Sequence, residues 1–180
     1  LIDSFHDKFK IKIFIDDSPF SKYLEEKKIK KNCIFVKPKN VESLISEISR
    51  IDFGIFVDSG PLHIAKIYDI KGILIETSVS NKILLSNSKN IYSSNNNYKS
   101  NYCNGPCGLV DIFSFEKRIG CYETNKLFFK DIKRLKSFKN LQRWNKKDIN
   151  SQFILNPVGC IKEIDIKNII KLINIKIKEC

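Results

Sequence analysis

Several features are scarce or missing in this sequence. It contains no methionine, and its 180 residues include only 2 histidines and 1 tryptophan. No apolar run is long enough to cross a membrane, and the first residues lack the charged, apolar, small-residue order of a signal peptide. We therefore expect a cytoplasmic protein. Because the chain starts at Leu1 and has no methionine, we also expect it to be a piece of a longer protein.

Acidic residues are in the minority, with 20 Asp and Glu against 32 Lys and Arg and a formal net charge of +12. Such an excess favours contact with phosphates, nucleic acid or anionic lipid headgroups. No aromatic RNA-binding signature, basic-leucine pattern or zinc-finger spacing accompanies it, so we do not expect nucleic acid as a partner. A bias of composition towards lysine, isoleucine and asparagine is the preferred explanation of the charge.

The residues that are present indicate a globular α/β fold. The sequence is 42 % hydrophobic and 11 % aromatic, which is enough to bury a core. Apolar strands alternate with helices in the first half, as in a Rossmann-like parallel sheet with flanking helices. The expected strands are 10–16, 33–38, 53–58, 72–77 and 91–93, and the expected helices are the tail of one within 1–9, then 20–31, 41–51 capped by Asn40, and 62–68.

The second half changes in character. Residues 81–100 are rich in asparagine and serine and predict loops around the short strand. The end of the chain has apolar residues at helical spacing after a cap at Asp165, which predicts a terminal helix over 164–177. We divide the chain into a Rossmann-like core (1–100), a cysteine-containing loop and insertion with a helix candidate at 126–138 (101–155), and the terminal helix packing back on the core (156–180).

The stretch "GIFVDSGPLHIAK", residues 54–66, has the parts of an anion site. Ligands of parallel sheets bind beyond the carboxyl ends of the strands, where this loop is expected. Gly60 allows a close backbone approach and tolerates positive φ, Pro61 suits a first helical turn, and the amides of that turn attract phosphate. His63 can donate to a phosphate or sugar oxygen. A turn that caps a helix, with a structural histidine, explains the same residues equally well.

A resemblance favours the ligand site. The segment "FGIFVDSGPLHIAKIYDIKGILIE" resembles the carboxy-terminal part of the family nine glycosyltransferases, the ADP-heptose:lipopolysaccharide heptosyltransferases and their relatives. A second segment group, "YCNGPCG", "GCY" and "CIKEIDIKNII", resembles the cysteine-bearing tail of that family, so the likeness spans 1–121 and 156–175. The residues that match the family's shared motif are Asp58, Ser59, Gly60, Pro61, His63 and Ala65.

The resemblance implies the carboxy-terminal half of a GT-B enzyme, in which two Rossmann-like domains face a cleft. This half would bind a nucleotide-diphosphate sugar such as ADP-heptose for inverting transfer to a lipopolysaccharide or another saccharide or lipid-linked acceptor. The enzyme would lie in the cytoplasm or peripherally at the anionic inner membrane face. The expected donor-binding residues are Asp58, Ser59, Gly60, Pro61, His63, Thr77 and Ser78, and no other cofactor is expected.

The sequence also departs from the family. It has "ETSVSN" where the family has a Phe-Gly-Pro-Thr type loop, and Glu76 would bring a carboxylate near the diphosphate unless it binds a ribose or sugar hydroxyl. The resemblance implies that the first strand of the domain, its loop and lysine, and the acceptor domain with the catalytic base lie outside this chain. We therefore expect no catalytic residue here, and donor binding without transfer.

Cysteine is common, with 6 in the chain, and 4 of them have a spacing that bears on metal binding. Thiolates are zinc ligands, but these cysteines lack the paired knuckles of a zinc ribbon, so thiols without metal are the expected state. They would be reduced, or joined in a disulfide in an oxidising compartment, and a structural zinc site is the alternative. A metal-stabilised or basic binding module without catalytic activity is correspondingly the alternative function. The four cysteines concerned are Cys103, Cys107, Cys121 and Cys160.

Overall fold

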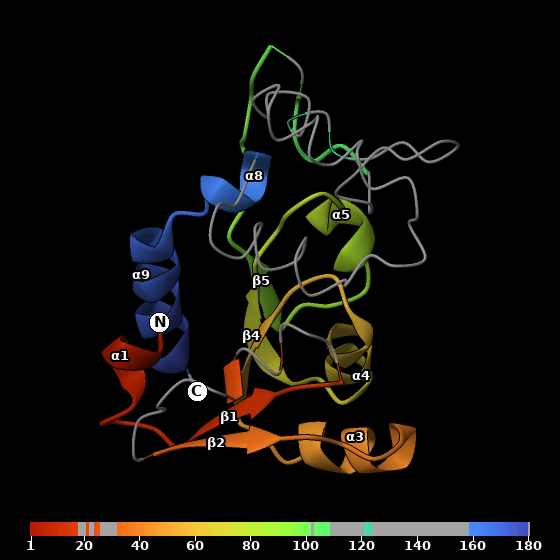
Figure 1. The fold of residues 1–180 in the computed structure, drawn as a ribbon, viewed down its shortest axis with the longest axis vertical. Helices are drawn as coiled ribbons and strands as arrows, with labels where there is room; N and C mark the ends of the chain where they lie inside the picture. Colours follow the sequence, from red (N-terminus) through yellow and green to blue (C-terminus); the bar gives the residue numbers. More distant parts are fainter. Residues whose placement is uncertain are drawn as a thin grey trace, which may run out of the picture.

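The computed structural model describes residues 1–17, 21, 24–25, 32–101, 103–108, 121, 123 and 159–179. Their architecture is α/β, as the sequence predicts (Figure 1). The strands are β1 (Ile11–Phe14), β2 (Cys33–Val36), β3 (Phe53–Phe56), β4 (Lys71–Leu74) and β5 (Ile91–Ser93). The helices are α1 (Ile2–Phe5), α3 (Val41–Ile48), α4 (Gly60–Ile67), α5 (Asn81–Leu84), α8 (Gly159–Lys162) and α9 (Ile166–Ile177).

All pairs of named strands are parallel, which confirms the type of sheet expected. β1 pairs with β2, and β4 lies between β3 and β5. The described strands therefore form two small sheets instead of the single sheet expected from the sequence. No described strand pairs with the second edge of β1 or of β3, although Phe14 of β1 packs against the core beside β3.

Helices cover both faces of the three-stranded sheet (Figure 1). Consecutive residues of β4 point to opposite faces, because side chains alternate along a strand. Leu74 joins the first core with residues of α3, α4 and α5, and Ile73 joins the second with residues of α1 and α9. Both side chains are fully buried. The expectation that the terminal helix packs on the core is thus confirmed.

Local signals at the helix ends explain where two helices begin. Asn40 caps α3, because its side-chain oxygen accepts a hydrogen bond from the Ser43 amide at 2.8 Å. The Ser43 hydroxyl oxygen accepts from the Asn40 amide in return, which completes a capping box. Asp165 caps α9 by accepting from the Asn168 amide at 3.0 Å. Both caps are as predicted, because a side-chain oxygen there satisfies an amide that has no partner within the helix.

A pair of glycines fixes how closely β3 and β4 pack. Gly54 and Gly72 are opposite each other in the register, and the Phe56 ring lies over both. A Cβ on Gly72 would be 2.4 Å from the Gly54 carbonyl oxygen. This close approach leaves room for an aromatic side chain over the strand pair, so both positions require glycine.

Some expectations differ from the structure or lie outside it. Val41, an apolar residue at the start of the predicted helix 41–51, is 67 % exposed, because the buried face of α3 begins further along. α4 begins at Gly60, earlier than predicted, and the short helices α5 and α8 were not predicted. Most of the expected helix 20–31 and all of the candidate 126–138 lie outside the described residues.

Candidate functional site

The carboxyl ends of β3 and β4 form one edge. The two strands pair through Phe56 and Leu74, and the Ile75 amide donates to the Phe56 carbonyl at 2.8 Å. The loop that contains Asp58 follows β3, and the loop that contains Thr77 follows β4. The structure therefore brings the two groups of predicted donor-binding residues to the same edge of the sheet, where parallel sheets bind ligands.

The start of α4 is not capped by a side chain. Ser59 is the N-cap residue in extended conformation, and its hydroxyl donates to the Val57 carbonyl at 3.0 Å instead of accepting from the first helical turn. Gly60 and Pro61 follow as the first two helical residues. The Ser59 side chain therefore does not cap the helix, as the alternative interpretation of this turn would require.

The side chains of α4 separate into a buried and an exposed set. Leu62 and Ala65 are fully buried in the first core. His63 and the preceding Asp58 are exposed, and neither makes a hydrogen bond or ion pair with any residue that the structure describes. His63 is therefore not the satisfied structural histidine of the alternative interpretation.

The first turn of α4 has fewer free backbone amides for an anion than the sequence pattern indicates. Pro61 has no N–H, and the Leu62 amide donates to the Ser59 carbonyl at 3.1 Å. Gly60 is not in the left-handed region, which in the described glycines is occupied by Gly108 and Gly159. A Cβ added at Gly60 would meet nothing within 4 Å, so its own chain does not require a glycine there.

Thr77 and Ser78 are half-buried after β4. The Ser78 carbonyl accepts from the Gly108 amide at 2.6 Å, and the Thr77 carbonyl accepts from the Asn96 side chain. Their hydroxyls make no hydrogen bond with the described part of the chain. The backbone of this loop is therefore held by the cysteine loop and the segment after β5, while the hydroxyls stay available.

Glu76 is directed into the protein, which corrects the expectation of a carboxylate beside a diphosphate. Its side chain is 6 % exposed. It accepts from the amides of Asn81 at 2.6 Å and Asn96 at 2.7 Å. A buried carboxylate needs such donors, and here the α5 start and the loop after β5 supply them. Glu76 thus joins three segments at the edge of the sheet.

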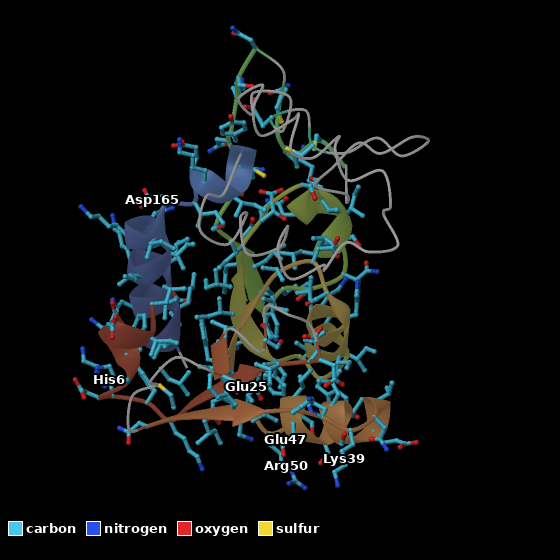
Figure 2. The ribbon with its side chains drawn as sticks, in the orientation of Figure 1. His6, Glu25, Lys39, Glu47, Arg50 and Asp165 are labelled. Carbon is cyan, nitrogen blue, oxygen red and sulfur yellow. The ribbon has the colours of Figure 1, made fainter. Side chains whose placement is uncertain are left out.

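Open pockets lie on the β5 side of the sheet among the described residues, and two of them, which the sequence did not predict, are defined by their lining residues. The larger is about 670 Å³, and its lining includes Glu76, the segment 94–100, Cys160 and the loop before α9. In Figure 2, Asp165 of this lining lies at the start of α9, next to α8. The second, about 480 Å³, lies between α5, β5 and α9. Neither contains the predicted donor-binding residues around α4.

The four cysteines of the second half lie in three segments of the chain, and Cys121 is next to Gly159, the residue before Cys160. Burial raises the pKa of the Cys103 thiol to about 11, and charges on the other three cysteines act in the same direction. Burial also raises the pKa of Cys160. None of the described cysteines forms a disulfide. Among the described residues, no three His, Cys, Asp or Glu side chains are arranged to hold a metal ion as they stand.

Comparisons with known proteins identify no relative of this chain. No model of a protein family matches the chain, and no significant match is found among curated proteins or solved structures. In the parts of the chain that the structure describes, no helix combines the length and apolar character needed to span a bilayer.

Proposed function

We propose that this chain is the donor-binding half of an inverting glycosyltransferase that uses a nucleotide-diphosphate sugar. One observation carries the proposal. Asp58 and His63 are exposed and have no partner among the described residues, yet they flank the start of a helix at the carboxyl edge of a parallel sheet. They are two of the residues by which the sequence resembles the heptosyltransferase family.

The diphosphate is assigned to the start of α4. The positive end of the helix dipole and the Gly60 amide attract an anion there, and the space at Gly60 admits a close approach. His63 donates to a phosphate oxygen and, when protonated, adds charge that stabilises the departing diphosphate. Asp58 cannot donate when ionised, so it is assigned to a ribose or sugar hydroxyl.

Transfer itself needs groups that we place in a separate acceptor domain. An acceptor hydroxyl must lose its proton to a general base as it attacks the anomeric carbon, and the nucleoside diphosphate leaves from the opposite side. The residues assigned here bind the donor and stabilise the leaving group only. This chain is accordingly proposed to bind nucleoside diphosphates without catalysing transfer.

Calorimetric titration of ADP, GDP and UDP into the chain tests the proposal. We expect saturable binding of at least one of them, weakened roughly tenfold or more by His63→Ala, because each charge-assisted hydrogen bond contributes about 1.5–3 kcal/mol. Asp58→Ala should weaken binding of a sugar donor or nucleoside in the same way.

Two further variants sharpen the test. Gly60→Ala should leave the free energy of unfolding nearly unchanged, since no protein atom lies within 4 Å of the added carbon, but it should weaken binding. His6→Ala is the matched control, because His6 follows α1 and pairs with Asp7, far from α4 (Figure 2). Binding that is insensitive to His63→Ala, or absent for all three nucleotides, would contradict the proposal.

A further inference from the structure

The strand β5 lies at the edge of the three-stranded sheet. It pairs with β4 on one side, and no described strand pairs with its other side (Figure 1). A strand at such an edge presents a row of N–H and C=O groups that can pair with another chain. β5 contains neither a proline nor a charged residue, which are features that commonly block an edge.

The hydrogen bonds to β4 determine which backbone groups of β5 point outward. The carbonyl of Asn90 accepts from an amide of β4 at 3.0 Å, and the amide of Ser94 donates to a carbonyl of β4 at 2.9 Å. Successive residues of a strand direct their backbone groups to opposite edges, so Tyr92 also faces β4. The N–H and C=O groups of Ile91 and Ser93 therefore point to the free edge.

These outward groups have no partner in the described part of the chain. Neither the N–H nor the C=O of Ile91 or Ser93 makes a hydrogen bond with any described residue. Ile91 is only 4 % exposed, so water has little access to it. A buried backbone group without a hydrogen bond costs free energy. An added strand would supply the missing partners of both residues at once.

A groove follows the free edge of β5. The second pocket, of about 480 Å³, lies between α5, β5 and α9, and all three residues of β5 belong to its lining. α5 packs on one face of the sheet and α9 on the other, which confines an entering chain to the plane of the sheet. An extended strand fits this position, because it lies about 4.8 Å from its neighbour in that plane.

The charge of the groove favours an acidic occupant. Its described lining contains Lys82 and Lys176 and no Asp or Glu. Lys176 Nζ pairs with the Glu179 carboxylate at 2.9 Å and lies 3.8 Å from the centre of the Tyr92 ring. The ammonium group of Lys82 makes no hydrogen bond or ion pair with a described residue. Lys82 is therefore the cation that remains to attract a carboxylate.

We propose that the free edge of β5 binds an extended acidic peptide of a partner protein as an additional strand. Backbone hydrogen bonds to Ile91 and Ser93 give affinity, and the contact of a peptide carboxylate with Lys82 adds the preference for acidic segments. A second copy of this chain is the less complementary occupant, because its net charge is +12. The inference is independent of the proposed donor site.

Selection of random dodecapeptides displayed on phage against the folded chain tests the proposal. We expect enriched peptides that contain Asp or Glu and β-branched residues. The tightest binder is then synthesised in two forms, each N-methylated on one of the two alternating sets of amides. Methylation of the set that faces β5 should lower the affinity about tenfold or more, whereas methylation of the other set should leave it nearly unchanged. No enriched peptide, or equal effects of both sets, would overturn the proposal.

Hydrogen exchange locates the bound peptide on the sheet. The Ile91 and Ser93 amides should exchange about tenfold more slowly or less when the peptide is bound, because they become donors to it. The Tyr92 amide already faces β4, so its exchange should change much less. Binding without protection of Ile91 and Ser93 would overturn the proposal. Protection that instead rises with protein concentration in the absence of peptide would also overturn it, since a second copy would then occupy the edge.

Two lysine variants test the preference for acidic peptides. Lys82→Glu should weaken binding of the selected peptide about threefold or more, because it replaces an attraction by a repulsion. Lys39→Glu is the matched control, since Lys39 is also exposed but lies beside α3, away from β5 (Figure 2). It should leave the affinity unchanged. Both substitutions are at the surface and should not disturb folding. Equal affinities of the two variants would contradict an acidic occupant.

Discussion

At the scale of single residues, the carboxylate of Glu76 organises the edge at which ligands are expected. It is the buried acceptor for two amides, from the α5 start and from the loop after β5. The Ser93 hydroxyl lies within 3.4 Å of the same carboxylate. The sequence predicts that Glu76 follows the strand β4. Its hydrogen-bond donors, however, lie up to twenty residues further along the chain, and the residues of β4 alone do not predict these contacts.

We predict that Glu76→Gln lowers the free energy of unfolding by about 1.5–3 kcal/mol, the usual contribution of hydrogen bonds to charged groups. The amide group of glutamine has only one accepting oxygen, so one buried N–H would face another donor. Urea denaturation measures the loss. Glu163→Gln is the control, because Glu163 lines the same cavity but is exposed, and its change should be within about 0.5 kcal/mol. Equal effects of the two variants would contradict this role.

At the scale of elements, the terminal helix α9 depends on packing more than on its own hydrogen bonds. Its second-core residues, Ile169 and Ile173, are each 1 % exposed and contact the face of β4 that carries Ile73. The helical spacing of isoleucines predicted this helix, but Ile166, which has that spacing, is 44 % exposed. Spacing alone therefore did not decide which isoleucines are buried.

We predict that Ile173→Ala lowers the free energy of unfolding by about 2–5 kcal/mol, because it leaves a cavity between α9 and β4. Ile175→Ala removes the same atoms from a side chain that is 44 % exposed. It should cost much less. Chemical denaturation of both variants provides the measurement, and a loss at Ile175 as large as that at Ile173 would show that α9 is not docked by this face.

An ion pair links β1 to α3. Lys12 Nζ donates to the Glu47 carboxylate at 2.7 Å, and this hydrogen bond is the main cause of a pKa of Glu47 below its ordinary value of 4.5. A lowered carboxyl pKa means that the stabilisation is present above the unfolded-state pKa and is lost as the pH falls through the folded-state value.

We predict that the coupling free energy between Lys12 and Glu47 is favourable at neutral pH and disappears on acidification below pH 4.5. A double-mutant cycle with Lys12→Met and Glu47→Gln isolates the interaction of this pair from that of other groups. The free energies of unfolding are measured by denaturation at neutral pH and at a pH below 4.5. The coupling should be small, because solvent still reaches both half-buried side chains and screens their charges. A coupling that persists at acid pH would indicate that charge is not its cause.

At the scale of the whole molecule, stability should be distributed unevenly between the two sheets. β4 lies between two cores, and Ile73 and Leu74 are fully buried. All residues of β1 are only partly buried. The three-stranded sheet therefore holds most of the buried apolar surface among the described residues.

We predict that the amides of β4 exchange with solvent more slowly than those of β1 and β2 in native-state hydrogen exchange. Local opening of a segment costs less when it exposes little apolar surface. The exchange free energies of Ile73 and Leu74 should approach that of global unfolding, while those of Ile13 and Phe35 fall below it. Comparable protection of all four amides would mean that the two sheets open as one unit.

The sequence by itself determined the α/β class, the parallel strands, the caps at Asn40 and Asp165, and the position of Asp58 after a strand. These follow from local periodicity and from backbone amides that lack partners at helix starts, both of which act over a few neighbouring residues. For the same reason the segment around Asp58 and His63 could be singled out before any contact was known.

Only the tertiary structure decided the division into two sheets, the inward direction of Glu76, the open pockets beside β5 and the position of Cys121 next to Gly159. The spacing of the cysteines indicated separate thiols, with 38 residues between Cys121 and Cys160. Cys121 nevertheless lies beside the residue that precedes Cys160, because the segment that contains it packs against the start of α8. Such contacts depend on where whole segments pack, which no local pattern of residues specifies.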